Sequence, residues 1–208
     1  MAGFKKVQVL GSDERYRKDL SDFVFKLDAA VKDTATFYYP FDSLKKCIPI
    51  HYSPDKRIRF YFKDIGYDSP AFIAYAQVVV STGNIVLQDL CKPKNVLLNY
   101  LIYEVHEVVI DSVKHYVAFG WGSHGHSYAT VHIFKLVKNN LAECFSCFEN
   151  NKPPEFMYNY FGRGLYSRLV FDPLTNNIGL KLYEREKSPE SVEPTTKLYF
   201  VNGKYEEK

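Results

Sequence analysis

The stretch Ser53-Pro54-Asp55-Lys56, followed by the alternating run 57–63, decides the fold class of this chain. The first four residues have the composition of a tight turn, and the run after them alternates like a strand. Alternate side chains of a strand point to opposite faces, and we predict that one face of this strand lies in the core. The apolar face carries Ile58, Phe60 and Phe62, and the other face carries Arg57, Arg59 and Tyr61.

Turn and strand units of this kind recur to the end of the chain and predict about ten antiparallel strands. The run 96–110 is ambiguous, because its leucines also approach helical spacing. We assign it to a strand on the β-branched residues at its end. The predicted strands are 48–52, 57–62, 71–80, 85–90, 96–110, 113–119, 128–137, 141–148, 165–171, 178–183 and 198–201. Asn202-Gly203 has the composition of a turn, and the interval 149–164 is interpreted as a longer loop.

One amphipathic helix is expected near the N-terminus, within residues 12–33. Ser12 is a suitable N-cap, and acidic residues follow it in the first turn. The apolar residues then keep helical spacing, so their stripe is predicted to pack on one face of the following sheet. They are Tyr16, Leu20, Phe23, Val24, Leu27 and Val31.

Sequential hairpins without helical crossovers predict a mainly β fold, an antiparallel meander that forms a curled sheet, a barrel or a sandwich. The alternative is a partial β-propeller-like array. The sequence shows no repeat of about forty residues, which is the length that a propeller blade needs. We expect residues 1–208 to form a single domain, since all-β domains often reach this length.

Composition excludes some partner classes. The chain has 27 basic and 24 acidic side chains and a net charge of +3, which lacks the basic excess of a nucleic-acid-binding protein. The apolar residues near the N-terminus are too few for a membrane span or a secretory core. Localisation therefore stays open: the protein is cytoplasmic, or exported if a signal sequence was removed.

The four cysteines include a Cys-x-x-Cys pair, Cys144 and Cys147. Such a pair is a redox site or half a zinc site in some proteins. Here it lies in a predicted strand, where residues three apart point to opposite faces and do not share a ligand. We interpret the cysteines as ordinary apolar side chains, with a disulfide or a zinc site as alternatives.

The strongest candidate binding site is the segment 120–128, which combines the single tryptophan with two histidines and three glycines. The candidate ligand-binding residues are Trp121, His124, His126 and Tyr128. His124 and His126 share a face of an extended chain, and His132 follows on the next strand, but no carboxylate is near in sequence. We therefore predict no metal site here, and a hairpin connection is the default.

No sequence motif identifies a reaction or a cofactor, so we predict neither a catalytic residue nor a cofactor. The turn and strand signatures are similar in general character to those of β-rich bacterial proteins, and they reproduce no family motif. The expected function is a non-catalytic binding or structural module that recognises a protein or a glycan. The alternative is a hydrolase or metal-dependent enzyme with its site around residues 120–128.

Overall fold

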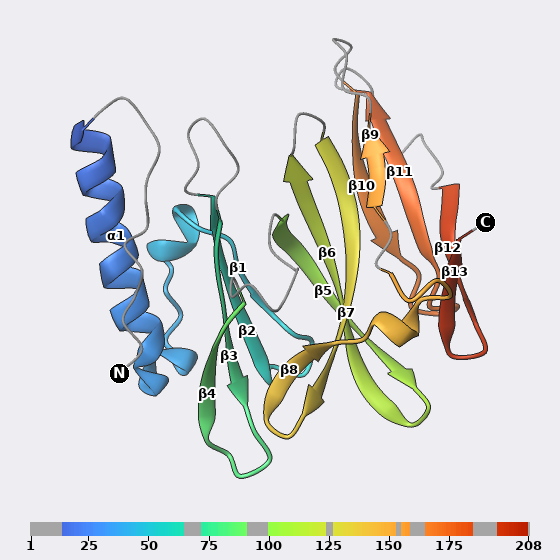
Figure 1. The fold of residues 1–208 in the computed structure, drawn as a ribbon, viewed down its shortest axis with the longest axis horizontal. Coiled ribbons are helices and arrows are strands. Elements are labelled where there is room, and N and C mark those ends of the chain that lie inside the picture. The colour runs from blue at the N-terminus through green and yellow to red at the C-terminus, as the bar shows by residue number, and fades with distance from the viewer. Residues whose placement is uncertain are drawn as a thin grey trace.

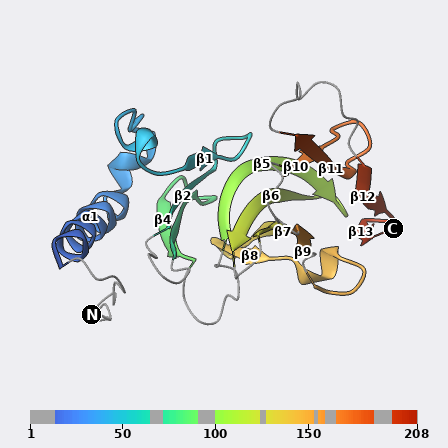
Figure 2. The same ribbon diagram turned by 90° about the horizontal axis from the view of Figure 1, so that it is seen from above.

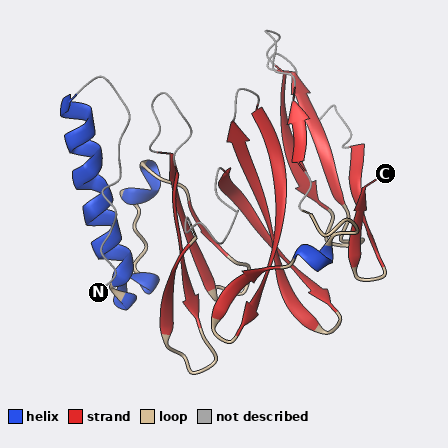
Figure 3. Cartoon of the chain, viewed as in Figure 1, coloured by secondary structure: helices blue, strands red, loops and turns tan. Residues whose placement is uncertain are grey.

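The computed structural model describes residues 14–64, 72–90, 100–123, 127–152, 155–158, 165–184 and 195–207. The described part of the chain begins with one α-helix, α1 (Glu14–Lys32), followed by two short 3-10 helices, η1 (Thr34–Tyr38) and η2 (Leu44–Lys46). Strands form nearly all of the remaining regular structure (Figure 3). The prediction of a mainly β, antiparallel fold with one N-terminal helix is confirmed.

The strands form three antiparallel sheets in sequence order. Sheet A contains β1 (Ile50–Tyr52), β2 (Ile58–Asp64), β3 (Phe72–Val79) and β4 (Ile85–Asp89). Sheet B contains β5 (Tyr100–Ile110), β6 (Val113–Ser123), β7 (Ser127–Val137) and β8 (Asn140–Glu143), with β9 (Glu155–Tyr158) paired to β7. Sheet C contains β10 (Leu165–Phe171), β11 (Ile178–Glu184), β12 (Thr195–Val201) and β13 (Lys204–Glu207).

The helix and the three sheets are stacked as layers, with α1 on one outer side, then sheets A, B and C (Figures 1 and 2). A cluster of buried side chains fills each space between layers. Leu27 and Val31 of α1 pack with Ile73 of sheet A. The cluster between sheets A and B includes Phe60, Phe62 and Phe134, and the one between sheets B and C includes Phe119, Ile133 and Ile178.

Both faces of sheet A are buried, which corrects the expectation that only one face of β2 lies in the core. Arg59 and Tyr61, on the face opposite Phe60, are 0% exposed. The reason is that α1 and the segment after it cover this face, as the packing of Leu27 beside Tyr61 shows. The predicted helix stripe is therefore confirmed at its described positions, whereas Ser12 lies outside the described residues.

Two-residue turns connect three of the hairpins, between β5 and β6, β7 and β8, and β12 and β13. Both residues of each turn have positive φ angles, which matches the right-handed twist of the paired strands. Asn202-Gly203 was predicted as a turn from composition, and its φ angles are 49° and 78°. The other two turns are Asp111-Ser112 and Lys138-Asn139.

Two short strands were not predicted. β9 lies within a segment interpreted as a long loop, and β13 follows the last predicted strand. Both form because a neighbouring strand supplies hydrogen-bonding partners: β9 pairs with β7, and β13 pairs with β12. Their sequences, Glu-Phe-Met-Tyr and Lys-Tyr-Glu-Glu, lack the alternation of apolar and polar residues that indicates a strand.

Each sheet contains a meander of four consecutive strands that spans about 40 residues, the size of a propeller blade. A propeller-like array, the alternative prediction, would also consist of successive four-stranded meanders. The described strands form open sheets and do not close into a barrel. No helix in the described ranges is sufficiently long and apolar to cross a membrane.

Candidate functional site

The predicted 120–128 site is mostly strand rather than loop. β6 continues to Ser123 and β7 begins at Ser127, so the connection between them is only three residues long. Trp121 pairs with Ala129 in the ladder of these strands, and Tyr128 pairs with Gly122. His124 and His126 lie outside the described residues. The proposed binding role of these residues stays a prediction.

A hydroxyl, an imidazole and a carboxylate follow one another on β7 and β8. Nε2 of His132 lies 3.2 Å from Oγ1 of Thr130, and Nδ1 of His132 lies 2.7 Å from Oε1 of Glu143. This order of groups resembles that of a hydrolase triad. However, Thr130 is 0% exposed and the His132 and Glu143 side chains are each 5% exposed. These three side chains therefore form a buried polar network between strands.

An aromatic segment, residues 38–41, begins at the last residue of η1 and continues toward η2 on the surface. Tyr38 is 73% exposed and Tyr39 is 60% exposed, whereas Phe41 is half-buried. Each exposed ring contacts a neighbouring ring edge to face: Tyr38 contacts Phe37 at 5.1 Å between centroids, and Tyr39 contacts Phe41 at 5.0 Å. Two large aromatic side chains are thus exposed to solvent while neighbouring rings restrict their orientation.

The buried side chain of Arg59, on β2, forms hydrogen bonds with the backbone at this segment. Its Nη1 atom donates hydrogen bonds to three backbone carbonyl oxygens, those of Thr36 at 2.8 Å, Phe37 at 2.9 Å and Tyr39 at 2.7 Å. Irregular backbone has no ladder to satisfy its carbonyl groups, so a buried donor at this point fixes its conformation. Arg59 therefore ties the aromatic segment to the central part of sheet A.

Aromatic rings surround the Arg59 guanidinium where a carboxylate would be expected. Its central carbon lies 4.7 Å from the ring centroid of Phe41, 4.9 Å from that of Tyr52 and 5.1 Å from that of Tyr61. Rings at this distance attract a cation through their electron-rich faces. Burial lowers the pKa of Arg59, and the nearby Tyr61 and Tyr52 act in the opposite direction.

Gln77 of β3 gives a second point of attachment on the same face. Its Nε2 atom donates to the carbonyl oxygen of Val31 at 2.9 Å and lies 3.1 Å from Oγ1 of Thr36. Its Oε1 atom accepts a hydrogen bond from the hydroxyl of Tyr61. Burial raises the pKa of Tyr61 to about 12, so this hydroxyl keeps its proton at neutral pH. Arg59 and Gln77 together position the end of α1, η1 and the aromatic segment.

The turn that identified the fold class connects sheet A to sheet B through Asp55. Its Oδ2 atom accepts hydrogen bonds from Nζ of Lys114 at 2.9 Å and from the hydroxyl of Tyr116 at 3.0 Å. Its Oδ1 atom accepts one from the hydroxyl of Ser53 at 2.7 Å. Burial acts to raise the pKa of Asp55, but the hydrogen bonds from Lys114, Ser53, Arg57 and Tyr116 outweigh it, so the pKa is lowered.

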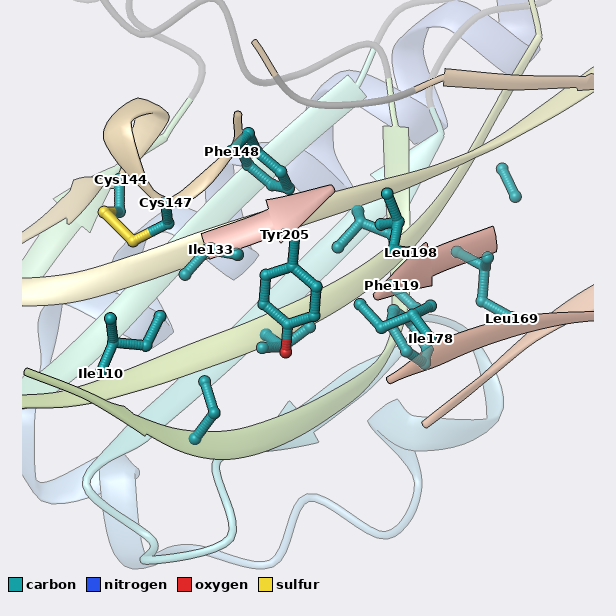
Figure 4. Close-up of a cluster of buried hydrophobic side chains, with 14 of the residues drawn as sticks. Ile110, Phe119, Ile133, Cys144, Cys147, Phe148, Leu169, Ile178, Leu198 and Tyr205 are labelled. Carbon is teal, nitrogen blue, oxygen red and sulfur yellow. A yellow bond between two sulfur atoms is a disulfide. The ribbon is translucent and has the colours of Figure 1, made fainter. Parts of the chain in front are cut away.

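The Cys-x-x-Cys pair forms a disulfide between Cys144 and Cys147, which corrects its interpretation as two ordinary apolar side chains. The strand assigned to 141–148 ends at Glu143, and a 3-10 helix, η3 (Phe145–Cys147), follows. Residues three apart are eclipsed in a 3-10 turn, whereas they point to opposite faces in a strand. The disulfide lies at one end of the buried cluster between sheets B and C, beside Ile133 (Figure 4).

Sequence reasoning missed the positioning role of Arg59 and gave the disulfide only as an alternative. The alternation of β2 did place Arg59 opposite Phe60, but an arginine on such a face is usually solvated. The signal that was available is the run of aromatic residues at 37–41 after a helix, which needs a donor for its irregular backbone.

Comparisons with protein-family models, with curated proteins and with solved structures found no match to this chain.

Proposed function

We propose that this chain is a non-catalytic binding module that recognises a protein through the aromatic segment, residues 38–41. The observation that carries the proposal is the use of a fully buried arginine to hold two exposed tyrosines. Three hydrogen bonds from Arg59 end on the backbone that presents Tyr38 and Tyr39. Burying a charged guanidinium is costly, so its use to hold this backbone suggests that the position of the two tyrosines matters.

A fixed backbone favours binding because less conformational entropy is lost when the partner docks. Tyrosine supports this role, since its ring gives a large contact area with only two side-chain torsions to restrict. The edge-to-face contacts with Phe37 and Phe41 restrict those torsions further. The segment thus has the properties of a preorganised recognition surface.

Charge near the segment favours a protein over a neutral glycan. Lys45 and Lys46 in η2 are exposed, and the backbone N–H of Lys45 donates to the carbonyl oxygen of Phe41 at 2.9 Å. The Lys45 ammonium is paired with Asp42 at 3.8 Å, whereas Lys46 forms no ion pair within the described residues. Positive side chains beside exposed rings complement a protein surface that combines acidic and apolar groups. A neutral sugar offers the lysines no opposite charge.

The test compares binding to a peptide array and to a glycan array. We expect the unmodified protein to bind a subset of peptides that contain acidic and apolar residues. Combining Tyr38→Ala with Tyr39→Ala should reduce that binding by about tenfold or more, since buried aromatic contacts dominate interface energies. Leu174→Ala is the matched control, because Leu174 is 93% exposed and lies in a turn of sheet C.

The outcomes separate the partner classes. Peptide binding that survives loss of both tyrosines would overturn the proposal, and so would an absence of signal on both arrays. Binding to glycans alone, lost with the tyrosines, would replace the protein partner with a carbohydrate. Binding lost equally in the Leu174→Ala control would indicate nonspecific adhesion and would also count against the segment.

A second candidate is the hydrolase with its site near residues 120–128, and the Thr130, His132 and Glu143 network is the observation that favours it. Its weakness is the complete burial of the Thr130 hydroxyl, which a nucleophile does not tolerate. Ester and peptide substrates provide the test. Turnover that disappears in His132→Gln, in protein that remains folded, would support this candidate over the binding module.

A further inference from the structure

A histidine from another strand lies beside the Cys144–Cys147 disulfide. A ring nitrogen of His115 and the two sulfur atoms all lie within 4.8 Å of one another, and all three residues are buried. His115 belongs to β6, whereas Cys144 precedes η3 and Cys147 is its last residue. Two sulfur atoms and one imidazole are a common ligand combination for zinc.

The position of His115 suits a metal ligand. Its Nδ1 atom lies 2.8 Å from the carbonyl oxygen of Val113, so Nδ1 carries the ring proton in the neutral form and donates it to that oxygen. The lone pair is then on Nε2. Zinc-binding histidines are usually oriented in this way by a carbonyl or carboxylate on the second nitrogen. Lys135 is the cross-strand neighbour of His115 on β7.

We propose that Cys144, Cys147 and His115 form a latent site for Zn²⁺, which binds after the disulfide is reduced. A dithiol reductant supplies two electrons and two protons: the S–S bond of the protein breaks, two thiols form, and the dithiol becomes a disulfide. Zn²⁺ then replaces both thiol protons, which are released to solvent. A solvent molecule completes the fourth position.

The rearrangement that this site needs is small. Zinc lies about 2.3 Å from thiolate sulfur and about 2.0 to 2.1 Å from imidazole nitrogen, so tetrahedral ligand atoms are roughly 3.5 to 3.8 Å apart. The three donors are already gathered within 4.8 Å, so displacements of about 1 Å form the site. Two thiolates neutralise the ion, which limits repulsion by the neighbouring Lys135.

Access to the disulfide is through η3. Cys144 and Cys147 are 4% and 3% exposed, but Phe145 between them is 43% exposed and Ser146 is also exposed. Opening this one turn brings a reductant to the sulfurs without separating sheets B and C. A local opening of η3 is therefore sufficient to convert the disulfide form of the site into the reduced, zinc-binding form.

The test uses the full chain with Cys47→Ser and Cys91→Ser, so that only the two relevant cysteines remain. The protein is reduced with dithiothreitol, desalted without oxygen and titrated with Co²⁺ alone. We expect one equivalent to produce a sulfur-to-cobalt charge-transfer band, which one equivalent of Zn²⁺ then removes. The oxidised protein should give no band. Zn²⁺ should also raise the unfolding temperature of the reduced protein and leave that of the oxidised protein unchanged.

Two variants and a control make the result specific. Cys144→Ser should abolish the band, and His115→Gln should weaken Co²⁺ binding by about tenfold or more. His106→Gln is the control histidine and should have no effect. A band of equal affinity in His115→Gln, or no band in the reduced protein, would overturn the proposal. A reduced protein that unfolds and is not refolded by Zn²⁺ would overturn it as well.

Discussion

The space between α1 and sheet A and the space between sheets B and C are filled in different ways. The first contains buried polar groups, including Arg59, Gln77 and the hydroxyl of Tyr61, which form directed hydrogen bonds. The second is filled mainly by aliphatic and aromatic side chains around Phe119 and Ile133. The polar interface positions irregular backbone, whereas the apolar interface joins two regular sheets.

This difference follows from what each interface has to hold. Sheets B and C satisfy their own backbone groups in ladders, so apolar burial is sufficient to join them. The backbone of residues 36–39 has carbonyl groups that no ladder satisfies, and side chains from sheet A provide the donors. Buried polar groups thus fix the backbone conformation through directed hydrogen bonds, whereas hydrophobic contact stabilises an interface without such direction.

The largest effect is expected in the apolar interface. Phe119→Ala removes a fully buried ring and should lower the free energy of unfolding by about 3 to 5 kcal/mol. Urea denaturation at pH 7 measures it. The control is Phe25→Ala on α1, which is 75% exposed and should change stability by less than about 0.5 kcal/mol. Equal effects at the two positions would contradict the assignment of Phe119 to the core.

In the polar interface, Arg59→Met should lower the free energy of unfolding by about 2 to 3 kcal/mol, because three carbonyl groups each lose a hydrogen bond. The carbonyl group of Thr36 keeps the bond from the Tyr39 N–H, and that of Phe37 keeps the bond from the Tyr52 hydroxyl. It should also speed amide hydrogen exchange in residues 36–41 before other regions exchange. Arg57→Met is the neighbouring control, since the Arg57 side chain donates one hydrogen bond, to the carbonyl oxygen of Val79. Unchanged exchange in residues 36–41 would argue against the positioning role.

Asp55 tests whether polar contacts also join sheets A and B. Asp55→Asn should lower the free energy of unfolding by about 1 to 2 kcal/mol at pH 7, since a charge-assisted contact to Lys114 is lost. The folded pKa of Asp55 is lowered, so its contribution is present above pH 4 and is lost as pH falls through the folded value.

The difference between the wild type and Asp55→Asn should therefore shrink as the pH is lowered from about 5 to about 2. Urea denaturation across this range measures it. A difference that stays constant with pH would show that the carboxylate charge does not contribute.

Tyr205 is an exception within the apolar interface and predicts a change of opposite sign. Its buried hydroxyl makes no hydrogen bond within the described part of the chain, and burial raises its pKa. Tyr205→Phe should raise the free energy of unfolding by about 1 kcal/mol, because an unsatisfied polar group is removed. Tyr116→Phe is the matched control: it loses the hydrogen bond to Asp55 and should be destabilising. Destabilisation by Tyr205→Phe would indicate a partner for this hydroxyl.

The smallest effect is expected at the exposed tyrosines. Tyr38→Ala and Tyr39→Ala should each change the free energy of unfolding by less than about 0.5 kcal/mol, since both rings are mostly in solvent. Thermal and urea unfolding provide the measurement. A larger loss would mean that these rings stabilise the fold, and the case for a recognition segment would weaken.

Particular elements show how far the pattern of the chain predicts the fold. The stripe of α1 and the Asn202-Gly203 turn were identified because helical spacing and positive φ preferences are local properties. The end of β8 was not identified, because apolar residues continue past Glu143 and the change to a 3-10 helix leaves no periodic signal.

The candidate sites were less predictable than the fold. Composition directed attention to Trp121, His124, His126 and Tyr128, but the strands of that hairpin extend further than its glycines indicate. Arg59 was placed on the correct face of β2 without its role, because its partners lie on a segment about 20 residues earlier that reaches it only after folding.

Local sequence patterns are sufficient for the β class, the antiparallel connections and the apolar face of α1, because alternation, helical spacing and turn chemistry act between near neighbours in the chain. The order of the layers, the burial of Arg59 and the proximity of His115 to Cys144 and Cys147 arise from long-range packing. Those outcomes depend on which surfaces exclude water together, and such contacts join residues whose separation in sequence follows no fixed spacing.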